Sequence, residues 1–237
     1  MLEVSHEELN DRFFTLIDEL NPDLFIEAGA NNGETSIRVS NQFPSCDIVA
    51  YEANEFIYNQ SAHLFYNSPV KYLNVALSDK VGKSKFYITK GSRKGASPFS
   101  DGPNYEAWNN SLKRKPGRDY QEQEVEIDTI DNNFKDSKHS RIAMWVDVEG
   151  HAMEVLKGSS ETLKRVELLK VELESIQLWE DQYIDKEVVR FLLDNNFIPI
   201  FKDTEYTTQY NTIFVKSNSN LSENSKGSRL DPPSLII

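Results

Sequence analysis

The alternation of short buried strands with helices through the first 80 residues restricts the fold more than any other feature. Strands are predicted at 23–29, 47–53 and 70–79, and helices between them at 35–43 and 54–67. Strands that alternate with helices at this spacing pair in parallel through right-handed crossovers. The sequence therefore predicts an α/β protein whose sheet is mostly parallel and is covered by helices.

The rest of the chain extends this pattern at both ends. An amphipathic helix is predicted at 6–20, opened by a capping box of Ser5 and Glu8. The helix at 54–67 is expected to place Phe56, Ile57, Leu64 and Phe65 on its inner face. Further strands are predicted at 83–89, 123–130, 141–150, 166–174, 197–201 and 211–216, with helices at 151–158 and 185–196.

The predicted elements give a seven-stranded, mostly parallel sheet with an antiparallel last strand, and additional β structure after the third strand. We expect one domain over residues 1–216, because 237 residues suit a single α/β domain. Residues 90–120 are irregular and rich in Gly, Pro, Ser and Asn, which predicts a lid-like insertion. Residues 217–237 have the composition of a polar tail.

Charge and composition restrict the partners. The chain has 26 basic and 38 acidic residues and a net charge of -12, so its field repels phosphates and disfavours nucleic acid and anionic membranes as partners. Its single cysteine excludes an internal disulfide. We expect no signal peptide and no membrane span, and a cytoplasmic location. The oligomeric state is left open.

The stretch FIEAGANNGE, residues 25–34, is the first candidate site. Ligands of such sheets bind at the carboxyl ends of the strands, where Gly29 and Gly33 let the backbone approach closely. Dinucleotide sites favour G-x-G-x-x-G, and this turn lacks the middle glycine, which disfavours an oxidoreductase. Glu27 before the turn suits a ligand that carries an ammonium group. A plain strand-to-helix turn is the alternative for the motif taken alone.

Glu52 strengthens the ligand interpretation. It ends the second predicted strand, 25 residues after Glu27, which matches one strand–helix–strand unit. A carboxylate at that place can accept from both ribose hydroxyls of a nucleoside. An amino acid joined to a nucleoside is S-adenosylmethionine, which is the predicted cofactor.

Several motifs occur together in one order across roughly residues 24–216: EAGANNGETS, AYEAN, NVALSDKVGKSKFYI, GASPFS, EIDTID, VDVEGHAMEVLKG and VELLKVELE. In this order they resemble the FkbM family of S-adenosylmethionine-dependent methyltransferases. The resemblance implies the class I (Rossmann-like) methyltransferase fold. It also implies O-methylation of a hydroxyl on a sugar, a glycan or a natural-product scaffold.

The resemblance also implies roles for individual residues. The methionine end of the cofactor would contact Glu27, Gly29, Ala30, Asn31 and Gly33; Glu52 would hold the ribose; Ala76, Ser78 and Asp79 would lie along the adenine; Asp147 would lie near the methyl group. The chain departs from the family pattern at Ala53, Trp145 and Ala152. The last two departures motivate an alternative, a non-catalytic scaffold that has kept the fold.

An alcohol acceptor must lose its proton, so the site needs a base. The candidates are Asp147, Glu149 and His151. His151 titrates near neutral pH, as a base should, although a local role at the start of a helix competes with this. Glu149 has a competing role as a helix cap. No third ligand can be placed beside Asp147 and Glu149, so no metal is predicted.

The segment 90–120 carries seven basic and three acidic residues within an acidic chain. Such a segment can recruit an anionic acceptor through Arg93, Lys94, Arg114 and Lys115, while Tyr105 and Trp108 stack on a sugar face. A solvated charged loop is the alternative interpretation.

Overall fold

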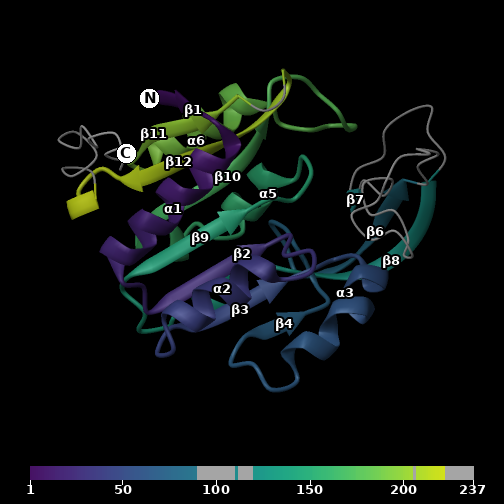
Figure 1. The fold of residues 1–237 in the computed structure, drawn as a ribbon. Helices are drawn as coiled ribbons and strands as arrows, with labels where there is room; N and C mark the ends of the chain where they lie inside the picture. Colours follow the sequence, from purple (N-terminus) through teal and green to yellow (C-terminus); the bar gives the residue numbers. More distant parts are fainter. Residues whose placement is uncertain (90–109, 112–119, 205–206, 222–237) are drawn as a thin grey trace, which may run out of the picture.

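The computed structural model describes residues 1–89, 110–111, 120–204 and 207–221 (Figure 1). Helices cover both faces of one large sheet, and a second, smaller sheet lies at one end of it. The predicted lid residues Arg93, Lys94, Tyr105, Trp108, Arg114 and Lys115 lie outside the described residues.

The large sheet contains eight strands. Their spatial order is β1 (Leu2–Val4), β11 (Phe197–Asp203), β12 (Gln209–Lys216), β10 (Val166–Glu174), β9 (Ile142–Val146), β2 (Leu24–Ala28), β3 (Asp47–Tyr51) and β4 (Lys71–Leu73). Strand β12 runs antiparallel to both neighbours, and every other pair is parallel. The predicted sheet is therefore confirmed. The additional edge strand β1 was not predicted, because three residues carry no readable periodicity.

Two helical layers sandwich this sheet. Helices α1 (His6–Leu20) and α2 (Glu34–Gln42) pack on one face, and α4 (Ile130–Phe134), α5 (Ala152–Lys157) and α6 (Asp185–Asp194) pack on the other. The backbone N–H of Glu8 donates to the Ser5 hydroxyl at 3.1 Å, as the predicted cap requires. Helix α1 ends at Asn21, which adopts a left-handed conformation. The predicted bounds of this helix are confirmed.

The predicted third strand at 70–79 was wrong as a single element. Strand β4 stays in the large sheet, whereas β5 (Ala76–Leu77) belongs to the second sheet. Between them, the side-chain amide of Asn74 donates to the backbone carbonyls of Glu52, at 2.8 Å, and Ala53, at 3.2 Å. These bonds fix the point at which the chain leaves the edge of the large sheet.

The second sheet is the predicted β-rich insertion. Its order is β5, β8 (Tyr120–Asp128), β6 (Gly82–Thr89) and β7 (Asn110–Ser111). Phe86, Ile88, Val125 and Ile127 form its small core. The strand predicted at 123–130 ends at Asp128, because Thr129 caps α4: its hydroxyl accepts the N–H of Asn132 at 3.0 Å.

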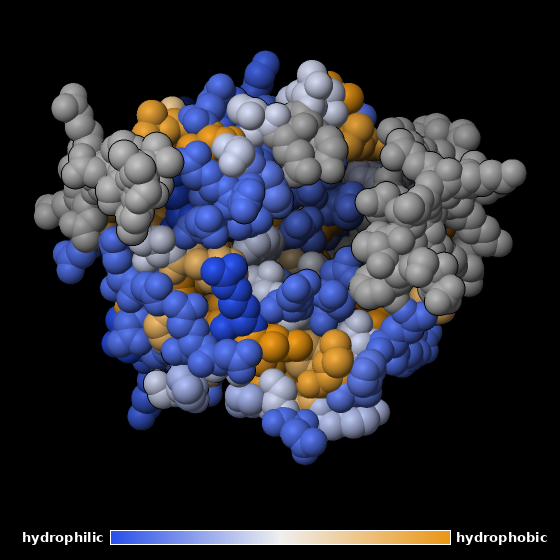
Figure 2. Space-filling model, in the orientation of Figure 1, coloured by the Kyte–Doolittle hydropathy of each residue, from blue (hydrophilic) through white to orange (hydrophobic). Residues whose placement is uncertain are grey.

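The helix predicted at 54–67 is shorter than expected. It comprises α3 (Glu55–Ser61) and a 3₁₀ turn, η1 (Ala62–Phe65). Ile57 and Phe65 are buried as predicted, but the predicted burial of Phe56 and Leu64 was wrong, since they are 38% and 49% exposed. A 3₁₀ turn has about three residues per turn rather than about 3.6, so the buried face shifts. Hydrophobic atoms accordingly gather at the surface near β4 and α3 (Figure 2).

The residues that follow β12 contact the rest of the domain. Ser219 donates to a Glu167 carboxylate oxygen at 2.7 Å, and Leu221 is buried, so the first residues after β12 pack on the domain. Within the described part of the chain, no helix has the length and apolar character needed to cross a membrane.

Candidate active site

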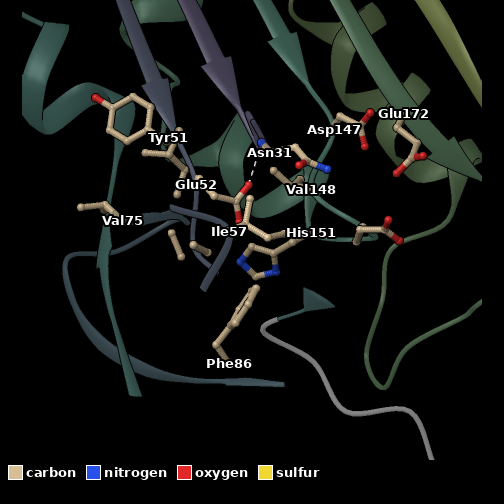
Figure 3. Close-up of a pocket in the computed structure, with 15 residues that line it drawn as sticks. Asn31, Tyr51, Glu52, Ile57, Val75, Phe86, Asp147, Val148, His151 and Glu172 are labelled. Carbon is tan, nitrogen blue, oxygen red and sulfur yellow. Dashed lines mark hydrogen bonds between the residues drawn. The ribbon is translucent and has the colours of Figure 1, made fainter. Parts of the chain in front are cut away.

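Two neighbouring cavities lie at the carboxyl ends of the central strands. The smaller has a volume of about 270 Å³ and takes its walls from the ends of β2, β3, β9 and β10, from residues 75–77 and from Phe86 of β6 (Figure 3). The larger, of about 660 Å³, lies against α2, α3 and η1. Gly29, Asn31 and Asp147 line both cavities, so the turn after β2 separates them.

The glycine turn brings two strand ends into contact. Gly29 has φ +80, and a Cβ there would lie 1.7 Å from the backbone oxygen of Asp147. Only glycine lets the turn approach β9 so closely. Gly33 has φ +71 and precedes α2, and a Cβ there would lie 2.3 Å from the Phe65 ring. Gly33 lines neither cavity, so close packing against Phe65 explains why this position is a glycine.

Glu52 is held at the end of β3 by two backbone amides. Asn31 N–H donates to one carboxylate oxygen at 2.8 Å (Figure 3). Asn54 N–H donates to the other at 2.7 Å. The side chain is buried in the wall of the smaller cavity. Burial raises the pKa of Glu52 to about 7, although both amide bonds favour the ionised form. Each carboxylate oxygen keeps a lone pair that a ligand hydroxyl can use.

Glu27 lines the larger cavity and not the smaller one. Its carboxylate accepts from the backbone N–H of Ser36, at 3.1 Å, and from the Ser36 hydroxyl. Burial raises the pKa of Glu27 to about 7. Ala30 also lines only the larger cavity. The predicted methionine-binding residues are thus divided between the two cavities.

The stretch predicted to follow the adenine is also divided. Val75, Ala76 and Leu77 line the smaller cavity, whereas Ser78 and Asp79 line neither. Helix α5 packs tightly beside this stretch, since a Cβ on Gly158 would lie 2.0 Å from the Ser78 carbonyl oxygen. The adenine contacts of Ser78 and Asp79 stay predictions.

His151 lies in the wall of the smaller cavity between two polar neighbours. Its Nε2 is 3.1 Å from the Ser78 hydroxyl, and its Nδ1 is 3.4 Å from a Glu154 carboxylate oxygen. Both ring nitrogens therefore have protein neighbours, and the residue caps the start of α5. This geometry favours a positioning role over that of a free base, although the base role stays a prediction.

Three carboxyl groups meet where β9 and β10 end. Asp147, Glu149 and Glu172 line the smaller cavity, and Figure 3 shows Asp147 and Glu172 side by side. Glu149 adopts a left-handed conformation with φ 52. Burial, followed by the charges of Asp147 and Glu52, raises the pKa of Glu149 to about 7. Among the described residues, no group of three His, Cys, Asp or Glu side chains could hold a metal ion.

Phe86 and Glu172 are among the lining residues that sequence reasoning missed. Phe86 comes from the second sheet, and nothing in its local sequence points to the cavity. Glu172 did carry a signal, because Lys170, Glu172 and Glu174 alternate along one face of a largely buried strand. Charged residues in a buried strand need a reason to be there.

This topology, with a carboxyl-end cavity behind a glycine turn, defines a Rossmann-like methyltransferase fold. The model of the methyltransferase FkbM domain matches residues 27–199, and the chain belongs to that family. No curated protein matches the sequence significantly.

Solved structures with a similar fold include three methyltransferases. One is FkbM from Methylobacillus flagellatus KT, with 10% identity, a TM-score of 0.49 and coverage of 82% of this chain; the chain spans 44% of that protein's length. Another is precorrin-6y C5,15-methyltransferase from Geobacter metallireducens GS-15, with 12% identity, a TM-score of 0.44 and 90% coverage of both chains.

The third is 1,6-didemethyltoxoflavin-N1-methyltransferase from Burkholderia thailandensis, which was solved with 1,6-didemethyltoxoflavin and S-adenosylhomocysteine bound. It has 9% identity and a TM-score of 0.42, and the match covers 89% of this chain and 78% of that one.

Proposed function

We propose that the protein uses S-adenosylmethionine to methylate a hydroxyl group on a sugar, a glycan or a natural-product acceptor. Membership of a methyltransferase family carries the transferase class. The acceptor atom and the acceptor class are proposed beyond what family membership gives.

The observation that carries this proposal is Glu52, a buried carboxylate in the wall of the smaller cavity beside the glycine turn. We place the ribose on Glu52 and the adenine against Val75, Ala76 and Leu77. The methionine part then crosses the turn at Gly29, where the two cavities meet. In this arrangement the sulfonium lies near Asp147, and the ammonium group is directed toward Glu27.

The described wall of the cavity favours a neutral acceptor. Asp147, Glu149 and Glu172 line the end of the cavity away from the adenine, and their charges repel an anion. A polyhydroxylated acceptor can instead hydrogen-bond to these carboxylates. Recruitment of an anionic acceptor by Arg114 and Lys115 stays a separate prediction, which lies outside the described residues.

The scaffold alternative rested on Trp145 and Ala152, and packing accounts for both. Trp145 makes an edge-on contact with Phe13, with ring centroids 5.3 Å apart, and the Lys170 ammonium lies 3.4 Å from the centre of its ring. Ala152 is buried in the core at the start of α5. Neither contact requires that transfer has been lost.

A transfer assay tests the proposal. The protein is incubated with S-adenosylmethionine labelled in the methyl group and with panels of sugars, glycans and hydroxylated small molecules. We expect S-adenosylhomocysteine to form together with a labelled ether in one acceptor class. Label on nitrogen or carbon would contradict O-methylation. Cofactor binding without transfer to any acceptor would support the scaffold alternative.

A further inference from the structure

The carboxyl groups of Asp147 and Glu172 form a pair with unusual surroundings. Asp147 follows β9, and Glu172 lies in β10. These two strands are parallel neighbours, and their register pairs Val146 with Val171. Both line the smaller cavity, at the end opposite Tyr51 and Val75 (Figure 3). A buried oxygen of Glu172, Oε2, has no hydrogen-bond partner among the described residues.

The surroundings of the pair disfavour two negative charges. Burial is the largest cause that raises the pKa of both groups. The charge of Asp147 raises the pKa of Glu172 further, whereas Lys170 and His6 act to lower the pKa of Asp147. Asp147 directly follows Val146 in β9 and Glu172 directly follows Val171 in β10, so the paired strands place the two carboxyl groups beside each other, where they can share one proton. Two carboxyl groups this close cannot readily both ionise in a buried site.

Two basic side chains among the described residues act on Asp147, and each also has another partner. Lys170 is fully buried, but its Nζ lies 2.6 Å from Asn10 Oδ1 and over the Trp145 ring, and burial lowers its pKa to about 8. His6 of α1 contributes a favourable charge to Asp147, but its Nδ1 is 2.9 Å from an Asp203 oxygen.

Within the described part of the chain, the remaining charged neighbours of the pair are acidic. They come from four strands: Glu27 lies in β2, Glu52 follows β3, Glu149 follows β9 and Glu174 ends β10. A positive charge that enters the cavity therefore meets a surplus of carboxyl groups, which favour it electrostatically.

We propose that Asp147 and Glu172 act as one base, which releases its shared proton when the sulfonium of S-adenosylmethionine binds and takes a proton from the acceptor hydroxyl during transfer. This inference rests on the proposed function. It adds Glu172 as a catalytic residue and assigns a charge to each step.

The proposed cycle balances. Binding of the sulfonium sends the shared proton to solvent and leaves two carboxylates beside one positive sulfur. In the transfer, the acceptor oxygen forms a bond to the methyl carbon, the carbon–sulfur bond breaks, and its electron pair stays on sulfur. The hydroxyl proton passes to the pair. The thioether product is then neutral at sulfur, and the pair again holds one proton, as before binding.

Calorimetry can test this cycle without an acceptor. S-adenosylmethionine and S-adenosylhomocysteine are each titrated into the whole protein at pH 7, in two buffers that differ in ionisation enthalpy. We expect S-adenosylmethionine to release about one proton more than S-adenosylhomocysteine. Protons linked to the ribose or the ammonium group are common to both ligands and cancel in this difference.

Variants identify the source of the proton. Glu172→Gln keeps a hydrogen-bond donor for Asp147 but removes the shared proton, so the difference between the ligands should fall toward zero. The matched control Glu167→Gln, in the same strand but bonded to Ser219, should keep the full difference. A thermal shift with S-adenosylhomocysteine checks that each variant folds and binds.

Three results would overturn the inference. Equal proton release by both ligands in the wild type would exclude a sulfonium-linked proton. A difference that survives Glu172→Gln but is lost in Glu149→Gln or Glu174→Gln would place the proton on another carboxyl group. If neither ligand binds, the proposed function fails and the inference fails with it, whereas binding of both without a difference contradicts the inference alone.

Discussion

The two ends of the smaller cavity hold their carboxyl groups in contrasting ways. At one end, both oxygens of Glu52 accept backbone N–H groups, from Asn31 and Asn54. At the other end, Asp147, Glu149 and Glu172 line the same cavity, and each acts on the pKa of at least one of the others. The first arrangement fixes a carboxylate in one orientation. The second gathers acidic groups, whose charge the buried Lys170 offsets only in part.

This difference separates recognition from chemistry. A carboxylate oriented by two amides suits a ligand that brings two hydroxyl donors, and its role does not depend on a charge change. Carboxyl groups that raise one another's pKa suit a site where charge appears and disappears. We therefore propose the ribose at the first end, and the sulfonium and the acceptor hydroxyl at the second.

The junction between the ends gives the largest predicted effect. Gly29→Ala would place a Cβ 1.7 Å from the Asp147 oxygen at φ +80. We expect the free energy of unfolding to fall by about 3 kcal/mol or more and the stabilisation by S-adenosylhomocysteine to disappear. Thermal melts with and without this ligand measure both effects.

Gly82→Ala is the matched control for that variant. Gly82 also has a positive φ, of 147, but a Cβ there would have nothing within 4 Å. It therefore carries the backbone cost without the collision, and ligand stabilisation should persist. A Gly29→Ala protein that still responds to S-adenosylhomocysteine would show that the close approach of β2 and β9 is not needed for binding.

Glu52→Gln tests the recognition end. It keeps the shape of the side chain but loses charge-assisted hydrogen bonds, which are worth about 1.5–3 kcal/mol each. The dissociation constants of S-adenosylmethionine and S-adenosylhomocysteine should both rise by roughly tenfold or more. Titration calorimetry measures them. An equal loss for both ligands is the expected sign of a ribose contact, and unchanged constants would place the ribose elsewhere.

The smallest predicted effect concerns the stability of the ligand-free protein against pH. Glu27, Glu52 and Glu149 have a pKa of about 7 in the folded protein and Glu174 of about 8, against ordinary values of 4.5. A raised folded pKa gives stability that is fully present below about pH 4.5 and is lost as the pH rises through 7 to 8. The Tm should therefore be several degrees higher at pH 5.5 than at pH 8.

General charge repulsion acts in the same direction in a chain of net charge -12, so a control is needed. Glu174→Gln should reduce the pH dependence. Glu124→Gln changes the net charge equally at a side chain that is 67% exposed, and it should reduce the dependence much less. A Tm that rises from pH 5.5 to pH 8 would contradict the assignment of buried, protonated carboxyl groups.

The sequence predicted those elements whose pattern is local. The bounds of α1 follow from its apolar spacing and from Ser5, and the glycine turn after β2 is visible as a motif. The prediction failed where distant contacts decide the structure. The break between β4 and β5 depends on Asn74 bonding to the carbonyls of Glu52 and Ala53, more than 20 residues away.

The site followed the same rule. Glu52 was predicted because it lies at the end of a strand that the pattern reveals, whereas Asp147 was predicted from the family resemblance. Glu172 was predicted only as part of a buried strand, since its role depends on lying beside Asp147 across the β9–β10 register. Phe86 reaches the cavity from the second sheet, whose packing no local pattern encodes.

Titration calorimetry with S-adenosylhomocysteine and, separately, NAD tests the central claim most directly. The glycine turn lacks the middle glycine of dinucleotide sites. The carboxyl groups of Glu27, Glu52 and Asp147 line the two cavities and would repel a pyrophosphate. We predict saturable binding of one S-adenosylhomocysteine per chain and no binding of NAD. Saturable NAD binding, or no heat with millimolar S-adenosylhomocysteine, would contradict the account.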